Sequence, residues 1–345
     1  MQVRSHSSMI LLDSLYINTG GGKVLLDYLV RQMHHNKLDV FYLFDERCRG
    51  SYEYIAEDRK MFMAPTIAKR NRFYKENRTR FSTVFCFGNI PPTIKLAVPV
   101  YTYFQNLILI RQVQETTLKE RWMLRLKSKF ISLHKNNTTF FIVQSESIKK
   151  ELCAAYRLAA DKCLVIPFYG EHTYTNVVKQ DHQYLYVSEG YEHKNHLRLI
   201  AAWKLVSKTR PELALHLTVS GAYPALQQLI TESAQAGVNI TNHGSVNRTE
   251  LRKLYATSRY LVYPSLIESF GLGLVEGCEA GCEIIAADLP YVHAIIDPYK
   301  TFDPYNVQNI ADAVLSTKGI TNSVQQITQL KIKNGVNSLL DMLAS

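Results

Sequence analysis

Short apolar runs recur along the whole chain, and segments long enough to be helices separate them. These runs are continuous rather than alternating, and they are rich in β-branched and aromatic residues. They comprise Met9–Leu12, Val40–Phe44, Val84–Phe87, Val98–Phe104, Phe140–Val143, Leu164–Ile166, Tyr184–Val187, Leu215–Val219, Val238–Ile240, Tyr260–Tyr263 and Glu283–Ala287. Strands that are apolar on both faces are typical of parallel sheets that helices cover on both sides. The sequence therefore predicts an α/β protein built on parallel sheets.

A polar segment without hydrophobic periodicity, residues 171–182, interrupts this series. A chain of 345 residues is too long for one ordinary domain and suits two. We therefore expect two doubly wound parallel-sheet domains, 1–172 and 183–325, followed by a partly helical segment, 326–345.

Two local features of the second domain are also predicted. A helix should follow Lys194, and another should end at Gly237, because glycine commonly terminates helices. The expected buried stripe of the first of these helices consists of Leu197, Ile200, Ala201 and Leu205.

Composition limits where the chain can function. No run of about 18 apolar residues appears, so we expect no membrane-spanning helix. The first apolar run ends at Asp13, which argues against a secretory signal and favours a cytoplasmic protein. Six cysteines, at positions 48, 86, 153, 163, 278 and 282, lack metal-ligand spacing, and we predict that they are buried free thiols.

The charge of the chain points to anionic partners. It carries 40 basic and 30 acidic residues, a formal net charge of +10. Such a balance favours nucleic acid, phosphorylated small molecules or an acidic membrane surface. The basic residues concentrate in segments 69–80 and 119–129, and one interpretation is that both segments are solvated helix faces.

The second basic segment also carries an apolar stripe. Its members, spaced four residues apart, are Leu118, Trp122, Leu126 and Phe130, and they are flanked by Lys119, Arg121, Arg125, Lys127 and Lys129. This pattern is typical of an interfacial helix on anionic lipid. Phe73 and Tyr74 of the first basic segment would join the same surface. The alternative is that Trp122 and Phe130 pack into the core of the N-terminal domain.

The segment Tyr263–Glu276 carries the strongest chemical signal. A buried strand ends at Pro264, a turn follows, and a helix is expected to begin around Gly271–Leu274. The amides and the positive dipole end of such a helix form a site for phosphate oxygens. Glu268 and Glu276, eight residues apart, flank this helix start, so one carboxylate can face a sugar while the other reaches a ribose.

This segment resembles the nucleotide-sugar motif of family 4 retaining glycosyltransferases, which belong to the glycosyl transferases of group 1. The similar stretches are Pro264–Glu276, Ala280–Asp288, Tyr186–Asn195, Leu217–Gly221, Asn242–Val246 and, more loosely, the glycine loop Asn18–Lys23. The resemblance implies a GT-B fold, in which two Rossmann-like domains face each other. It also implies that the N-terminal domain binds the acceptor, that the C-terminal domain binds the nucleotide sugar, and that segment 326–345 packs back on the N-terminal domain.

The resemblance also implies a role for each residue of the motif. Glu276 would hold the ribose hydroxyls, Glu268 would contact the donor sugar near the developing positive charge, and Lys194 would neutralise the leaving diphosphate. Further contacts to the donor would come from Phe270, Gly271, Leu272, Gly21, Gly22, Ser188 and Gly221. Preorganised positive groups at the diphosphate provide the largest stabilisation available to such a reaction, so no metal or other cofactor is expected.

The chain departs from the family pattern at two positions. Ser188-Glu189 stands where the family commonly has Gly-Arg, so one cation at the diphosphate is missing. Many members place a histidine beside the donor sugar, whereas the corresponding strand end here continues into Gln105 and Asn106. These amides would hydrogen-bond a sugar or acceptor hydroxyl, and because an amide is no general base, the departing phosphate would take the acceptor proton.

The sequence therefore predicts a retaining hexosyl- or N-acetylhexosaminyl-transferase. It would use a nucleoside diphosphate sugar and a glycan or lipid-linked glycan acceptor, in bacterial surface polysaccharide synthesis, on the inner face of the cell membrane. A nucleotide-sugar epimerase or phosphorylase on the same fold is one alternative. A nucleic-acid-binding protein is another, although the sequence holds no zinc site, RNP-like strand or basic recognition helix.

Overall fold

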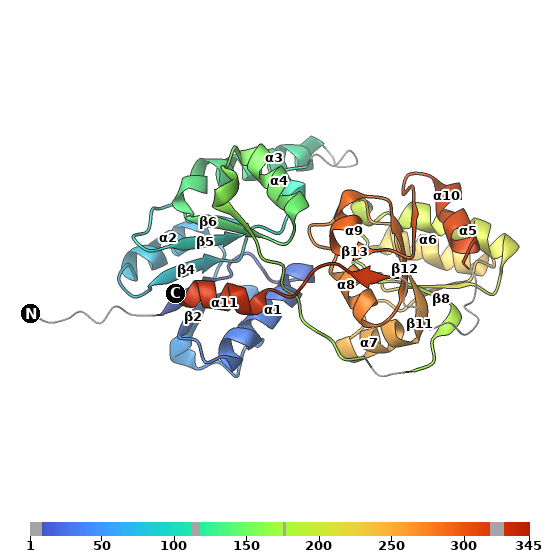
Figure 1. Ribbon diagram of the computed structural model, residues 1–345, viewed down its shortest axis with the longest axis horizontal. Coiled ribbons are helices and arrows are strands. Elements are labelled where there is room, and N and C mark those ends of the chain that lie inside the picture. The colour runs from blue at the N-terminus through green and yellow to red at the C-terminus, as the bar shows by residue number, and fades with distance from the viewer. Residues whose placement is uncertain (1–8, 112–117, 175–176, 318–327) are drawn as a thin grey trace, which may run out of the picture. The chain divides into compact units, whose positions relative to one another are not determined.

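The computed structural model describes residues 9–111, 118–174, 177–317 and 328–345. These residues form two compact units. Of the described residues, the first unit comprises those up to Gly170 together with 333–345, and the second comprises those from Glu171 to Ile332. Figure 1 shows that each unit has its own sheet with helices packed around it.

The first unit contains a seven-stranded sheet in the order β3-β2-β1-β4-β5-β6-β7. Its strands are β1 (Ile10–Asp13), β2 (Val40–Asp45), β3 (Lys60–Met63), β4 (Thr83–Cys86), β5 (Val100–Tyr103), β6 (Phe140–Val143) and β7 (Cys163–Val165). Every neighbouring pair is parallel. The central strands β1, β2 and β4 are buried along their whole length, which explains why their sequences are continuously apolar.

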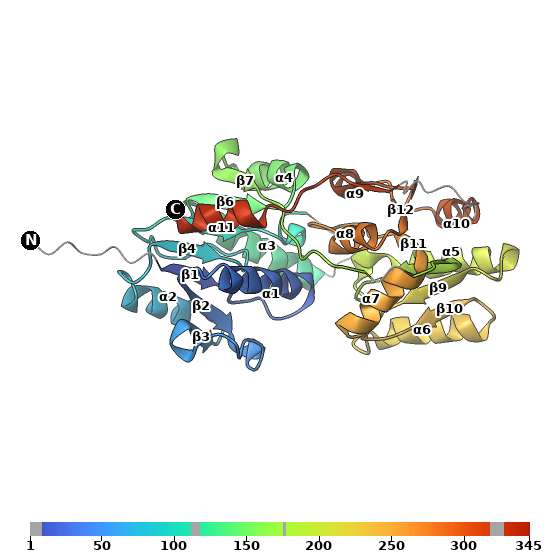
Figure 2. The ribbon, with the colours of Figure 1, turned by 60° about the horizontal axis from the view of Figure 1, so that its bottom comes forward.

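Among its described residues this unit has five α-helices: α1 (Gly20–His35), α2 (Ile67–Glu76), α3 (Leu118–His134), α4 (Glu146–Tyr156) and α11 (Val336–Ala344). The last of them packs against α1 and β4, and it lies beside α1 in Figure 1 and beside β4 in Figure 2. Hydrogen bonds hold the chain just before α11. The Gly335 amide donates to the Pro167 carbonyl at 2.6 Å, and the Asn334 side chain donates to the Tyr169 carbonyl at 2.8 Å. The returning segment begins at Lys333, seven residues later than predicted.

The second unit contains a six-stranded parallel sheet in the order β10-β9-β8-β11-β12-β14. Its strands are β8 (Gln180–Tyr186), β9 (Ala214–Leu217), β10 (Ile240–Asn242), β11 (Ser258–Tyr263), β12 (Glu283–Ala287) and β14 (Lys300–Phe302), and a small antiparallel pair is formed by β13 (Ile296–Asp297) and β15 (Gln329–Leu330). Its helices are α5 (His196–Thr209), α6 (Pro224–Gln235), α7 (Arg248–Thr257), α8 (Leu272–Glu279), α9 (Pro290–Ile295) and α10 (Val307–Leu315). The prediction of two parallel-sheet α/β domains is confirmed.

Some local predictions are wrong. In α5 the residues that are buried are His196, Leu199, Ile200, Ala202, Trp203 and Val206, whereas Leu197 is 64% exposed. The large Trp203 side chain, whose indole nitrogen bonds the Leu213 carbonyl, sets which face of α5 meets the sheet. The strands β3 and β14 were not predicted because both are short edge strands that are only partly buried. The expected end of α6 at Gly237 is confirmed, with φ at 86°.

The first basic segment does not form a solvated face throughout. Phe73 and Tyr74 are each 3% exposed and pack in the core of the first unit, so the prediction that they join a membrane surface is wrong. Arg70 is also 3% exposed. Its guanidinium bonds the Asp13 carboxylate at 2.6 Å, as well as the carbonyls of Ile90 and Pro91. The buried carboxylate at the end of β1 thus requires a buried cation.

The cysteines agree with expectation at five of the six positions. All six thiols are free, and all except the half-buried Cys153 are buried. Among the described residues, no helix is both long and apolar enough to cross a bilayer.

Candidate functional site

In each sheet the strands that follow one another in the chain are added first toward one edge and then toward the other. The change of direction falls between two adjacent central strands. These pairs are β1 and β4 in the first unit and β8 and β11 in the second. The loops that leave the carboxyl ends of such a pair diverge to opposite faces of the sheet, so a crevice opens there, and ligands of open α/β sheets bind in it. The topology alone therefore directs attention to the loops that follow these four strands.

In the second unit, hydrogen bonds join the loop after β8 to the loop after β11. The Leu266 amide donates to the His193 carbonyl at 2.8 Å, and the Ser265 hydroxyl donates to the same oxygen at 3.3 Å. The Asn195 side chain, which is buried, donates to the Pro264 carbonyl at 3.1 Å. Asn195 itself has φ at 62°, a left-handed conformation that asparagine tolerates better than most residues. These bonds position the residues that lie beside them, Lys194 and Glu268.

Lys194 and Glu268 form an ion pair between these loops. The Lys194 Nζ atom lies 2.6 Å from Glu268 Oε1, and the Tyr263 hydroxyl donates to the same oxygen at 2.9 Å. Burial alone would raise the pKa of the Glu268 carboxyl, but the Lys194 charge and the hydrogen bonds outweigh it and hold the pKa below the usual 4.5. Glu268 is therefore an ionised carboxylate at neutral pH, with a cation within reach of any ligand that approaches it.

The helix α8 begins directly after this pair. Gly271 caps it in the left-handed region, with φ at 74°, and Phe270 before it is buried. A side chain at Gly273 would approach the Tyr263 ring to 3.0 Å. The first amides of a helix have no partner within the helix, and they carry the positive end of its dipole. This turn thus suits a phosphate group.

Glu276 lies in the second turn of α8 and is largely buried. Its carboxylate accepts a hydrogen bond from the Tyr255 hydroxyl at 3.0 Å, and His172 Nε2 lies 3.7 Å from its other oxygen. Burial raises its pKa above the usual 4.5, and the Tyr255 bond and the Arg248 charge oppose that rise only partly. A carboxylate in this position can accept two hydroxyl groups of one ligand.

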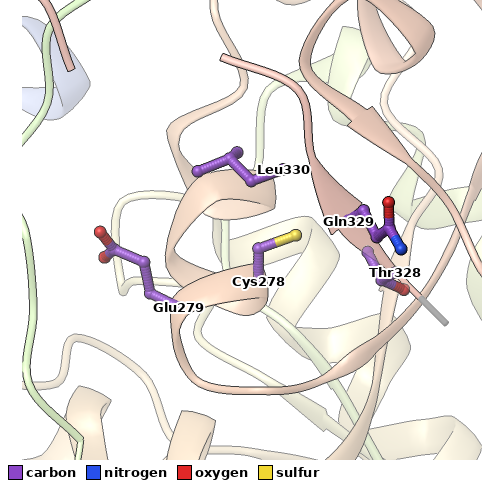
Figure 3. A pocket seen from close by; sticks show the side chains of 5 residues that line it. All are labelled: Cys278, Glu279, Thr328, Gln329 and Leu330. Carbon is purple, nitrogen blue, oxygen red and sulfur yellow. The ribbon is translucent and has the colours of Figure 1, made fainter. Parts of the chain in front are cut away.

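Sequence reasoning missed the neighbouring carboxylate, Glu279. It accepts a hydrogen bond from the His172 amide at 3.2 Å, and burial, followed by the charges of Glu171 and Glu276, raises its pKa to about 7. With Cys278 it lines a pocket between the last turn of α8 and Thr328, Gln329 and Leu330. Figure 3 shows Cys278 pointing toward the β15 residues and Glu279 pointing away from them. Only burial could have revealed Glu279, since no motif contains it.

Two further predicted donor contacts lie on neighbouring loops. Ser188 follows β8 and is half-buried, and its hydroxyl lies 3.1 Å from His196 Nε2. Gly221 follows β9 and is exposed, with open space around its Cα atom. Glu189, beside Ser188, is exposed and accepts a hydrogen bond from the Ser220 hydroxyl.

In the first unit, the loops after β1 and β4 touch each other. A Cβ atom at Gly88 would lie 2.2 Å from the Leu15 carbonyl oxygen, so only glycine fits there. The glycines Gly20–Gly22 follow β1 and form the first turn of α1. The next residue, Lys23, is paired with Asp27 at 2.6 Å.

The structure brings Gly22 and Gln105 together. A Cβ atom at Gly22 would lie 3.2 Å from Gln105 Nε2, and that nitrogen lies 3.4 Å from the Phe87 carbonyl. The sequence analysis did not single out Asn89. Its side-chain oxygen accepts a 2.7 Å hydrogen bond from the backbone amide of Gln105, and its φ is 66°. Asn106 instead caps a short 3-10 helix by accepting from the Ile108 amide. Gln105 is thus held at the edge of the sheet beside the glycine turn.

No group of three or more histidine, cysteine, aspartate or glutamate side chains in the described parts of the chain is arranged to hold a metal ion.

Comparison with known proteins connects the second unit to a family. Residues 171–332 match the family described as glycosyl transferases group 1. The O-antigen chain mannosyltransferase RfbU of Salmonella typhimurium is 26% identical over 160 residues, which cover 44% of this chain and 43% of that protein. The D-inositol 3-phosphate glycosyltransferase of Arthrobacter sp. is 32% identical over 93 residues, which cover 26% of this chain and 22% of that protein. The matched regions thus span less than half the length of these relatives.

Solved structures share the fold over most of the chain. HepE of Anabaena, in complex with UDP and glucose, aligns with a TM-score of 0.63 at 14% identity, covering 89% of this chain and 88% of that one. The sucrose-phosphate synthase of Thermosynechococcus elongatus aligns with a TM-score of 0.66 at 14% identity, with coverages of 89% and 88%. At such identities the likeness shows the fold alone. Together with the sequence match, it shows that residues 171–332 form a glycosyl transferases group 1 domain, within a chain that has the two-unit fold of solved glycosyltransferases.

Proposed function

We propose that the protein is a retaining glycosyltransferase of family 4. It transfers a hexose or N-acetylhexosamine from a nucleoside diphosphate sugar to a glycan or lipid-linked glycan, in bacterial surface polysaccharide synthesis. The observation that carries this proposal is the Lys194–Glu268 ion pair. It joins the loops after β8 and β11, at the point of the sheet where ligands bind, and it lies directly before the first turn of α8.

The proposed chemistry separates charge between the donor sugar and its diphosphate. As the bond from the anomeric carbon to the phosphate oxygen breaks, the Lys194 ammonium and the first amides of α8 stabilise the departing anion. The Glu268 carboxylate stabilises the positive charge that develops on the sugar. Glu276 accepts the ribose hydroxyls, while Phe270, Gly271, Leu272, Ser188 and Gly221 contact the donor.

Retention of configuration follows from an internal route. The acceptor oxygen bonds the anomeric carbon on the face that the phosphate leaves, and the acceptor proton passes to the departing phosphate oxygen. Gln105, at the position of the family histidine, is a neutral amide and cannot take that proton. We assign Gln105 and Asn106 to hydrogen bonds with sugar or acceptor hydroxyls, and Gly21 and Gly22 to contacts with the donor.

We also propose that the reaction needs no metal ion, because Lys194 and α8 supply the positive charge that a metal would otherwise bring to the diphosphate.

No single contact in the site identifies the base of the donor nucleotide. HepE was solved with UDP and glucose, and RfbU is a mannosyltransferase, so uridine and guanosine donors are both candidates.

The helix α3 supports a lipid-linked acceptor. Its exposed apolar residues are Trp122, Met123, Leu126 and Leu133, and the fractions of Trp122 and Leu133 that are exposed reach 65% and 69%. The buried residue Ile131 lies on the opposite face. The alternative in which Trp122 packs into the core of the N-terminal domain is therefore wrong. Phe130, which is half-buried, packs against the His134 ring.

The charges beside this face support a lipid surface as what covers it. The helix contains five basic residues and one acidic residue, Glu120, and Arg125, Lys127 and Lys129 are exposed beside the apolar residues. A second copy of the chain would bring the same cations against these, which disfavours a symmetric dimer through α3. Anionic lipid accepts both the apolar side chains and the cations. We propose that α3 binds the inner face of the cell membrane, next to a lipid-linked acceptor.

A thermal-shift panel of nucleotide sugars tests the proposed function. A donor at 100 times its dissociation constant should stabilise the protein by about 2.7 kcal/mol. Product analysis then separates the alternatives, since a transferase releases nucleoside diphosphate only with acceptor, an epimerase converts the sugar without release, and a phosphorylase requires inorganic phosphate. Salt-sensitive binding of oligonucleotides, combined with no response to any nucleotide sugar, would replace the proposal with nucleic-acid binding.

A further inference from the structure

A buried histidine contacts the loop that follows β8. His196 is the first residue of α5 and is 3% exposed. Its Nε2 atom lies 3.1 Å from the Ser188 hydroxyl oxygen, and the Tyr186 ring packs 5.0 Å from the imidazole. Ser188 is half-buried and stands two residues beyond the end of β8, so its hydroxyl lies at the sheet edge where ligands bind.

The surroundings of His196 determine the direction of this hydrogen bond. Burial, followed by the charges of Lys194 and His193, lowers the pKa of His196 to about 3, so the ring is neutral and has a single N–H group. Its Nδ1 atom is buried and has no hydrogen-bond partner among the described residues. A proton on Nδ1 would leave a buried donor unpaired, which is costly. The proton therefore resides on Nε2, and Nε2 donates to the Ser188 oxygen.

This arrangement leaves Ser188 with a proton to donate. The Tyr186 hydroxyl donates its own proton to the Lys194 carbonyl at 2.8 Å, so only its oxygen is left to accept from Ser188. A charged phosphate oxygen is a stronger acceptor than this phenolic oxygen. The adjacent side chain, Glu189, is an exposed carboxylate that bonds Ser220 and offers no positive charge to an anion. Ser188 is thus the polar donor that this loop presents next to Lys194.

We propose that the Ser188 hydroxyl donates a hydrogen bond to a phosphate oxygen of the nucleotide, and that His196 is the positioning residue that orients this hydroxyl. The proposal rests on the proposed function, because it requires a nucleoside diphosphate in the second unit. It gives the chain a neutral donor at the place where its sequence lacks a cation. His196 contacts no ligand, and its whole effect passes through Ser188.

Calorimetric titration with UDP and with GDP tests the proposal in matched variants. S188A should weaken the binding of the preferred nucleotide about tenfold, since a hydrogen bond to a charged group contributes about 1.5 kcal/mol or more. S220A removes a hydroxyl from the neighbouring strand end and should leave the affinity unchanged. H196Q, which keeps an N–H donor, should bind like the unaltered protein, whereas H196F should lose as much as S188A.

The double variant S188A/H196F separates positioning from a purely structural role. If His196 acts through Ser188, the double variant should bind no more weakly than S188A alone. Additive losses would overturn the role of His196, and an S188A variant with unchanged affinity would overturn the hydrogen bond. If neither nucleotide binds the unaltered protein, the proposed function fails as well, and the two failures are therefore distinguishable.

The tautomer of His196 can be measured without any ligand. Nitrogen-15 NMR of histidine-labelled protein, with the His196 signals assigned from H196Q, should show a neutral ring protonated at Nε2 between about pH 5 and pH 9. A ring protonated at Nδ1 would mean that Ser188 donates to the histidine and has no proton for a phosphate, and the proposal would then be wrong.

Discussion

Lys194 Nζ and Glu268 Oε1 lie 2.6 Å apart, and the two side chains are only 17% and 11% exposed. Removing one member of such a pair leaves the other charge buried and unpaired, at a cost of roughly 3 kcal/mol or more. K194A should therefore unfold at a lower temperature than the double variant K194M/E268Q, in which neither charge remains. Because the folded pKa of Glu268 is lowered, its stabilising contribution is present above pH 4.5 and is lost as the pH falls through the folded pKa. Equal melting temperatures for the two variants at pH 7 would contradict the pairing.

The two members of this pair should differ in their kinetic effects. E268A removes an interaction that strengthens as charge develops on the sugar, so we expect kcat to fall about 100-fold or more while donor binding changes little. K194A should reduce both kcat and the affinity for nucleoside diphosphate, and K194R should retain part of both because the charge remains. Steady-state kinetics with the donor identified by thermal shift measures these effects. Full activity in E268A and K194A would remove both residues from the mechanism.

Glu276 should control nucleotide binding rather than the chemical step. E276A should weaken nucleotide affinity about tenfold or more, because two hydrogen bonds to a charged acceptor are lost, while kcat at saturating donor stays close to that of the unaltered protein. The ionised form accepts both ribose hydroxyls, and burial raises the pKa of this carboxyl. Affinity should therefore decrease as the pH falls toward that raised pKa, at a higher pH than an ordinary glutamate would cause. Calorimetry across pH 5–8 checks this, and E276Q should show no such pH dependence.

Glu279 should make the second unit less stable at high pH. Its folded pKa is about 7, whereas the unfolded value is 4.5. A raised folded pKa means that the protonated form favours folding, so stability is full below pH 4.5 and declines as the pH rises to about 7. E279Q should therefore melt a few degrees higher than the unaltered protein at pH 8, at roughly 2–4 °C per kcal/mol, and at the same temperature at pH 4.5. A constant difference at both pH values would argue against this ionisation.

Activity should persist without divalent cations. Lys194 and the first amides of α8 are proposed to carry the charge at the diphosphate, so treatment with a chelator should leave the initial rate within about twofold, a change of about 0.4 kcal/mol in the barrier. Readdition of Mg²⁺ or Mn²⁺ serves as the control. A rate that vanishes with chelator and returns only with a divalent ion would mean that the diphosphate is held elsewhere.

Binding of α3 to anionic lipid should depend on charge and on Trp122. The variant R125E/K129E should sediment with phosphatidylglycerol vesicles at least tenfold less, since each basic residue near the surface contributes about 1 kcal/mol. The matched control is K204E/K208E, which makes the same change of net charge on the exposed face of α5 and should bind normally. W122S should weaken binding in high salt as well as in low salt. Failure of the unaltered protein to bind such vesicles at low salt would falsify the membrane proposal.

Much of the fold follows from local sequence. The central strands are continuously apolar because both of their faces are buried, and this pattern located nearly every central strand to within a few residues. The edge strands β3 and β14 were not predicted, because they are short and only partly buried and therefore lack a continuous apolar run. The glycine after α6 and the Pro264–Glu276 motif were likewise recognisable, because backbone conformation and helix starts depend on neighbours in the chain.

Periodicity, composition and motif spacing determined that this chain forms parallel-sheet α/β units and where the loops of its site begin. Only the tertiary structure decided which apolar helix faces are buried and which elements they pack against. Trp122 and Trp203 both lie on helices with apolar stripes, yet the first is 65% exposed and the second is fully buried. Arg70, from a strongly basic segment, pairs with Asp13 in the core, and Lys194 reaches a carboxylate 74 residues away. A helical pattern shows which residues share a face, whereas burial and ion pairing depend on elements that fold against that face from distant parts of the chain.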